Sequence, residues 1–122
     1  MMDETPLAAV DFEILETIVQ HRQTWPVMAA KYGVENPLPP WKTSLDALCD
    51  VLDRACSPDH QLLLPFVERR DEEDELSATR YAGLPYPESQ LVSLAYSLLA
   101  RGIIGEGELR ERLEVVRARL ES

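Results

Sequence analysis

The fold is decided by residues 87–121, which read PESQLVSLAYSLLARGIIGEGELRERLEVVRARLE. In each half of this stretch apolar residues recur every three or four positions, which places them on one face of a helix. In the first half they are Leu91, Leu94, Ala95, Leu98 and Leu99, and in the second half they are Leu109, Leu113, Val116 and Leu120. Because Gly102 lies between the halves and favours the end of a helix, we expect helices at about 87–101 and 106–121, joined as an antiparallel helical hairpin.

The same periodicity occurs upstream, and it predicts helices at about 7–23 and 43–56. Between them, residues 37–40 read PLPP, and three prolines in four residues indicate an extended linker rather than a helix. A short helix of one or two turns is expected at about 27–32, and residues 76–86 read as a loop before the hairpin.

These segments predict an all-α protein, because five glycines and few β-branched runs disfavour an all-β fold. We expect an extended helical arm that ends in the C-terminal hairpin, with no β-barrel. The proline run at 37–40 reads as a linker, and we expect an N-terminal helix and proline-rich linker arm over residues 1–39, followed by a helical domain over residues 40–122.

Charge limits the classes of partner. The chain of 122 residues has 22 acidic and 12 basic residues, for a formal net charge of −10. This balance argues against nucleic acid, whose binding needs Lys and Arg to displace counterions, and against anionic membrane surfaces. No apolar run approaches the ~20 residues that span a bilayer, and the N-terminus MMDETPLAAVDFE has acids where a secretory signal has bases. We therefore expect a cytoplasmic protein with neither nucleic acid nor membrane as a partner.

Motifs that carry chemistry are missing from the sequence. It has no glycine-rich phosphate loop, no Cys-x-x-Cys, no His-x-x-x-His and no Gly-x-Ser-x-Gly. His21 and His60 have polar neighbours, so we expect them on the surface. Cys49 and Cys56 lie on an apolar stripe, so we expect them in the core. The acidic run at 71–75 is more typical of a solvated face than of a cation site. The chain is therefore not expected to catalyse a reaction alone.

Two tryptophans and two arginines are candidates for contacts with a partner. Trp25 and Trp41 stand beside prolines, where such residues anchor a linker to a core or a partner more often than they form a ligand platform. Arg69 and Arg70 lie where an apolar segment meets the acidic run. Either they form local salt bridges, or one of them points into an interface and holds an anion.

The chain also resembles a known family. The residues that carry the resemblance are Pro40-Trp41, Gly83-Leu84-Pro85-Tyr86, the run LVSLAYSLLARGII at 91–104, and Glu108-Leu109. Together they resemble the helical N-terminal half of nitrile hydratase β subunits. They are most similar to the separate β-type subunit of thiocyanate hydrolase and of three-subunit nitrile hydratases.

The resemblance implies a non-catalytic subunit of a heteromeric lyase that hydrates a nitrile to an amide. A partner α-type subunit would hold the Co(III) or Fe(III) ion on oxidised cysteines, and this chain would hold no cofactor or metal. The β-type subunit wraps the α-type subunit and contributes an arginine to the oxidised-cysteine claw, where a forked guanidinium can hold two anionic oxygens. Aligned on Pro85, that arginine is Arg70, with Arg69 as the fallback. Trp25, Trp41 and Tyr86 are the expected interface residues.

The sequence departs from the family in several places. Pro87 replaces a second tyrosine, and Gln90 stands where the family often has tryptophan. The C-terminal SH3-like barrel is missing and with it the second claw arginine, so a separate barrel subunit would have to supply them. Two alternatives stay open: an activator or metallochaperone-type accessory protein for such an enzyme, and an unrelated helical adaptor.

Overall fold

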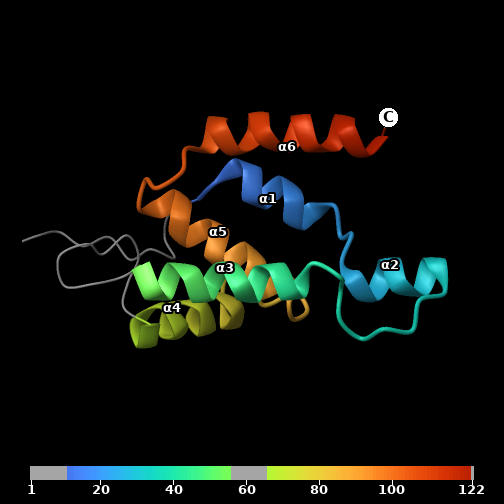
Figure 1. The fold of residues 1–122 in the computed structure, drawn as a ribbon, viewed down its shortest axis with the longest axis horizontal. Helices are drawn as coiled ribbons and strands as arrows, with labels where there is room; N and C mark the ends of the chain where they lie inside the picture. Colours follow the sequence, from blue (N-terminus) through green and yellow to red (C-terminus); the bar gives the residue numbers. More distant parts are fainter. Residues whose placement is uncertain (1–10, 56–65, 122) are drawn as a thin grey trace, which may run out of the picture.

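The computed structural model describes residues 11–55 and 66–121, and over these residues the protein is all-α, as the sequence predicts (Figure 1). The described residues form six helices and no strand. The helices are α1 (Glu13–Gln20), α2 (Trp25–Tyr32), α3 (Lys42–Ala55), α4 (Phe66–Ala78), α5 (Glu88–Ala100) and α6 (Glu106–Glu121). None of them is long and apolar enough to cross a membrane.

Helix α1 is shorter than the predicted helix at 7–23, of which residues 7–10 lie outside the described part. It begins after Phe12, whose backbone is extended, and it ends where Arg22 takes a left-handed conformation with φ 55°. That conformation is unfavourable for a residue with a side chain and stops the helix. Gly33 ends α2 in the same way with φ 69°, at no such cost because it has no Cβ.

Helix α4 corrects the prediction of a loop over 76–86, because it continues to Ala78 before the chain turns. The reason is Leu76, which is almost completely buried in the core and is held there by the last helical turn. Residues 56–65 lie outside the described part, and with them the predicted core position of Cys56 and the predicted surface position of His60. Ser57-Pro58, which favours a helix start, and Pro65, which favours a kink or a restart, belong to the same segment.

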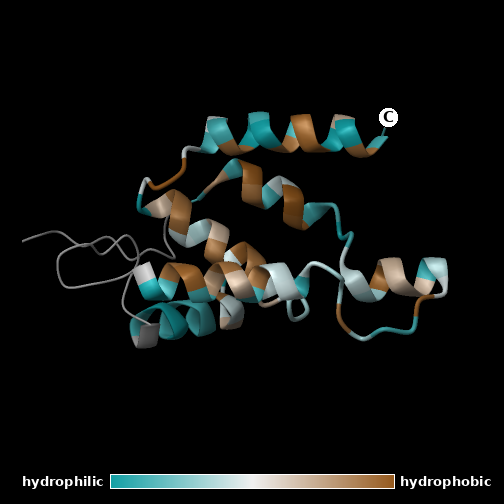
Figure 2. Cartoon of the chain, in the orientation of Figure 1, coloured by the Kyte–Doolittle hydropathy of each residue, from teal (hydrophilic) through white to brown (hydrophobic). Residues whose placement is uncertain are grey.

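The main core surrounds Tyr96 of α5, which has no exposed surface. The rings of Phe12 and Tyr81 meet Tyr96 edge to face, at centroid distances of 5.2 and 6.2 Å. The other buried members of this cluster are Ile14, Leu15, Leu76, Val92 and Leu99. Helix α1, which was predicted to belong to a separate arm, therefore shares one core with α4 and α5. Figure 2 shows the apolar residues on α1 and α5, whereas α4 is mostly hydrophilic.

A second cluster joins α3 to α5. Leu45 and Cys49 of α3 are buried against Leu94, and Trp41 packs against them from the linker. The core position predicted for Cys49 is thus confirmed, and His21 is exposed, as predicted.

Helix α6 follows α5 through a short turn in which Gly102 has φ 70°. Its first turns contact α1: the backbone N–H of Ile14 donates to Glu106 Oε2 at 2.9 Å, and Leu109 packs against the main core. Figure 1 shows α1 lying between α5 and α6. No residue of α6 is fully buried, so most of its surface is open.

Replacing Leu15 with alanine should lower the free energy of unfolding by about 2–5 kcal/mol, because the change leaves a cavity in the main core. Leu120→Ala is the matched control: Leu120 is 79% exposed, and its loss should cost less than about 0.5 kcal/mol. Urea denaturation of both variants measures the difference. Equal stability of the two would show that α1 does not belong to the core.

Candidate functional site

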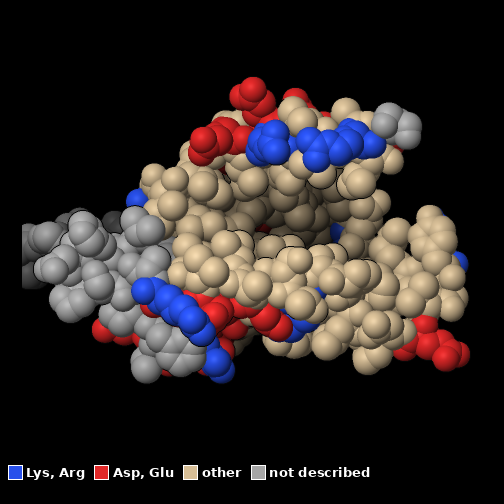
Figure 3. Space-filling model, in the orientation of Figure 1, with Lys and Arg blue, Asp and Glu red and all other residues tan. Residues whose placement is uncertain are grey.

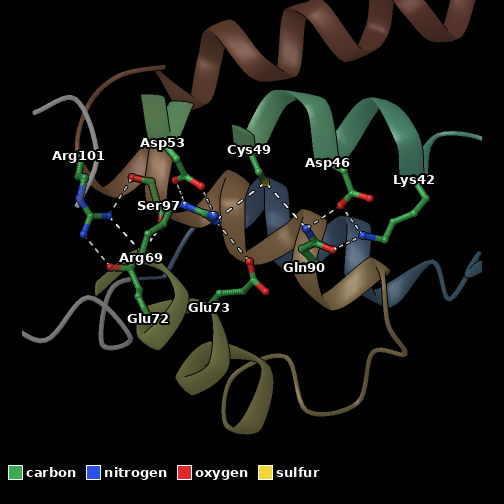
Figure 4. A network of polar contacts seen from close by, with 10 residues as sticks. All are labelled: Lys42, Asp46, Cys49, Asp53, Arg69, Glu72, Glu73, Gln90, Ser97 and Arg101. Carbon is green, nitrogen blue, oxygen red and sulfur yellow. Dashed lines mark hydrogen bonds and ion pairs between the residues drawn. The ribbon is translucent and has the colours of Figure 1, made fainter. Parts of the chain in front are cut away.

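A polar pocket of about 580 Å³ lies between α3, α4 and the beginning of α5. Its walls hold most of the residues on which the functional predictions depend. They are Lys42, Asp46, Cys49, Asp50, Asp53, Arg69, Arg70, Glu73, Asp74, Ser77, Tyr86, Ser89 and Gln90. Figure 4 shows that many of these side chains point toward one another and form a connected network of polar contacts.

Arg69 is the centre of this network and is only 5% exposed. Its guanidinium holds the Asp53 carboxylate with two bonds, Nε to Oδ1 at 2.6 Å and Nη2 to Oδ2 at 3.0 Å. Nη1 also contacts Glu73 Oε1 at 3.5 Å. A forked pair of this kind fixes both direction and distance, so Arg69 ties α4 to α3.

Cys49 lies at the floor of the pocket, where two donors face its sulfur. Arg69 Nη1 is 4.0 Å from Sγ, and Gln90 Nε2 is 3.9 Å from it. Burial raises the pKa of the Cys49 thiol, and the nearby guanidinium only partly opposes this shift. The thiol is therefore protonated near neutral pH and is a packing group rather than a nucleophile.

Lys42 closes the other end of the pocket. Its ammonium pairs with Asp46, one helical turn along α3, and donates to Gln90 Oε1 at 3.0 Å. The bond from Lys42 lowers the pKa of the Asp46 carboxyl. Lys42 Nζ also lies 4.9 Å from the centre of the Tyr86 ring, a cation–π contact that holds the exposed tyrosine at the rim.

A second ion pair extends the network away from the pocket. Arg101 Nη2 of α5 contacts Glu72 Oε2 of α4 at 2.7 Å, and the Ser97 hydroxyl donates to the same carboxylate. The acidic run at 71–75 is thus not only a solvated face, since Glu72 and Glu73 form internal ion pairs. Burial raises the pKa of the Glu73 carboxyl despite the neighbouring arginines.

The five predicted site residues divide between two cavities. Arg69, Arg70 and Tyr86 line the polar pocket, whereas Trp25 and Trp41 line a more apolar cavity of about 440 Å³ beside α1 and α2.

Trp25 is anchored at the beginning of α2. Its backbone N–H donates to Glu88 Oε1 at 2.8 Å, and its indole Nε1 donates to the Asn36 carbonyl at 2.7 Å. Trp41 packs on the cluster of α3 and α5. Both tryptophans therefore anchor the linker to the body of the protein, one of the two roles that the sequence left open for them.

Arg69 and Arg70 are neighbours in sequence, but one side chain is buried and the other is exposed. Successive residues of a helix point about 100° apart, so when one side chain turns inward the next can turn outward. Arg69 is buried in its ion pair with Asp53, whereas Arg70 is exposed at the wall of the pocket.

Most of the charged groups that line the pocket already pair with one another. Within residues 11–55 and 66–121, no group of three or more His, Cys, Asp or Glu side chains could hold a metal ion.

Sequence reasoning missed the roles of Lys42, Asp53 and Gln90. In the sequence, Asp53 can be recognised only as an acid on the polar side of α3. That position does not show which residue it pairs with.

No family model, no curated protein and no solved structure matches the chain. The resemblance to nitrile hydratase β subunits therefore stays a prediction from the sequence.

Replacing Arg69 with methionine should lower the free energy of unfolding by about 3–5 kcal/mol, because Asp53 would keep a largely buried charge without its partner. Arg70→Met should cost less than about 1 kcal/mol, since the side chain is exposed. Thermal or urea denaturation of the two variants compares them directly. A larger loss for Arg70→Met would reverse the roles assigned to the two arginines.

Cys49 should react slowly with iodoacetamide at pH 8, because burial shields the thiol and raises its pKa. Peptide mass spectrometry can follow this residue separately from Cys56. We expect modification of Cys49 in the folded chain to be at least about tenfold slower than in urea. Equal rates in the two conditions would contradict the burial of this thiol.

Proposed function

We propose that this chain is a non-catalytic β-type subunit of a heteromeric enzyme like nitrile hydratase or thiocyanate hydrolase. The enzyme would be cytoplasmic and would hydrate a nitrile to an amide. The metal, Co(III) or Fe(III), would belong to an α-type partner subunit, and a separate subunit would carry the SH3-like barrel. The sequence resemblance over residues 40–121 suggests this function, and the geometry of the two arginines supports it.

The single observation that carries the proposal is the exposure of Arg70 beside a buried Arg69. Arg69 is engaged with Asp53 inside the chain, so it is poorly placed to reach another subunit. Arg70 stands one residue further along α4, at the wall of an open pocket. This arrangement favours the primary alignment, in which Arg70 is the claw arginine, over the fallback to Arg69.

The proposed role of Arg70 follows from the shape of its guanidinium. Oxidised cysteines carry anionic oxygens, and a planar fork of N–H donors can hold two such oxygens at once. Groups that orient a metal site in this indirect way change activity by about 10–100-fold when they are removed. Arg70 would therefore position the partner's metal ligands and would touch neither the metal nor the substrate.

The interface predicted at Tyr86 is consistent with its position. Tyr86 is 60% exposed, yet the ammonium of Lys42 restrains its ring at the rim of the same pocket as Arg70. An aromatic side chain fixed at a rim loses little freedom when it is covered by a partner. We therefore propose that the rim carrying Arg70 and Tyr86 faces the α-type subunit.

Co-expression of this chain with an α-type subunit and a barrel subunit tests the proposal. Arg70→Ala should reduce kcat by about 10–100-fold, while gel filtration still shows the assembled complex. Arg70→Lys should restore little activity, because a single ammonium cannot replace the fork. Arg54→Ala is the matched control, since Arg54 is an exposed arginine that pairs with Asp50 of its own helix.

Full activity of the Arg70→Ala complex would refute the role of Arg70. A chain that is needed for maturation but is absent from the purified enzyme would instead indicate the accessory-protein alternative. If neither subunit binds the chain, the adaptor alternative is favoured.

A further inference from the structure

Helix α6 has an apolar seam with the spacing of a coiled coil. Its members are Leu109, Leu113, Val116 and Leu120, and the intervals between them are four, three and four residues. Alternating intervals of four and three are the a and d positions of a heptad, with Leu113 and Leu120 at a and Leu109 and Val116 at d. This α6 seam is therefore the kind of surface that packs against another helix.

Most of the seam is uncovered in the chain. Leu109 packs against the main core, but Leu113 is 39%, Val116 is 37% and Leu120 is 79% exposed. The reason is length: α6 has 16 residues and α1, which lies beside it, has only 8. At 1.5 Å per residue α1 spans about 12 Å against about 24 Å for α6. The C-terminal half of α6 therefore extends beyond its neighbour (Figure 1).

Arginines occupy every flanking position of the seam. In the same heptad register Arg110 and Arg117 are at e, and Arg112 and Arg119 are at g. Figure 3 shows basic side chains in a row along α6, although the whole chain has a formal charge of −10. The acids of the helix fall on the b, c and f positions, apart from Glu106 at its first residue. The sign of the charge is thus sorted around the helix.

Arg110 and Arg117 pair with acids of α6, but those contacts are weak. Arg110 Nη2 lies 3.8 Å from Glu106 Oε2, and Arg117 Nε lies 3.0 Å from Glu121 Oε1. Both are pairs at i, i+4 on the surface, where such pairs contribute little to stability. They leave the arginines able to turn toward a docked helix.

We infer that the α6 seam docks an amphipathic helix of another protein whose flanking positions carry Asp or Glu. Acidic side chains at these positions would lie opposite the four arginines and set the orientation of the partner. A second copy of this chain does not fit, because its α6 would bring arginines against arginines in either orientation. This inference does not depend on the proposed function, since it rests on α6 alone.

A binding experiment with designed peptides tests the inference on the full chain. Two fluorescent peptides of about three heptads share leucine at a and d and differ only at e and g, with Glu in one and Lys in the other. Fluorescence anisotropy should show the Glu peptide binding at least about tenfold more tightly than the Lys peptide at low salt. The difference should shrink as salt is added.

Two variants of α6 make the test specific. Arg112→Glu combined with Arg119→Glu should abolish the preference for the Glu peptide, because the two changes reverse the charge of the g positions along the seam. Leu120→Glu should weaken binding of the Glu peptide by at least about tenfold, and it should not disturb the fold since Leu120 is 79% exposed. Arg54→Glu, an exposed charge reversal on α3, is the control and should change nothing.

Several results would overturn the inference. They are equal affinity for the two peptides, no binding of either, or binding that the α6 variants leave unchanged. Self-association of the chain that Leu120→Glu abolishes would show instead that a second copy occupies the seam. None of these results bears on Arg70, so failure here is distinguishable from failure of the proposed subunit role.

Discussion

The arrangement of α3, α4 and the polar pocket depends on one ion pair, between Arg69 and Asp53. An arginine buried in a small helical protein has to be neutralised, because an unpaired charge in the interior is very costly. Asp53 does this with two bonds, and Glu73 and the Cys49 sulfur lie within 4.0 Å of the same guanidinium. The pair therefore sets how α4 lies against α3 and which way the next residue, Arg70, points.

Along α4, this ion pair gives two neighbouring arginines different positions. The inward arginine organises the pocket, and the outward arginine lies at its wall, where we propose that it contacts a partner subunit. Helix α6 has the same division, with Leu109 on the core and the remaining seam open between rows of arginine. In the two proposals made above, both surfaces contact other proteins. The charged groups of the polar pocket, in contrast, mostly pair with one another.

Much of the fold could be predicted because apolar spacing determines which face of a helix is buried. The periodic runs located α3, α5 and α6 to within one or two residues, and Gly102 marked the end of α5. Contacts distant in sequence could not be predicted. Nothing in residues 7–23 indicates that Ile14 and Leu15 pack beside Tyr96, and nothing in the charge run indicates that Arg69 pairs with Asp53 rather than with a nearby acid. The arginine pair was identified as important, but which arginine turns inward depends on the packing of α4.

The coupling free energy between Arg69 and Asp53 is the most direct measure of this account. It is obtained by denaturing the wild-type chain, Arg69→Met, Asp53→Leu and the double variant. We expect a coupling of at least about 1.5 kcal/mol, with the double variant more stable than either single variant, because the two changes together remove both buried charges. Additive losses, with a coupling near zero, would mean that the ion pair does not hold α3 against α4.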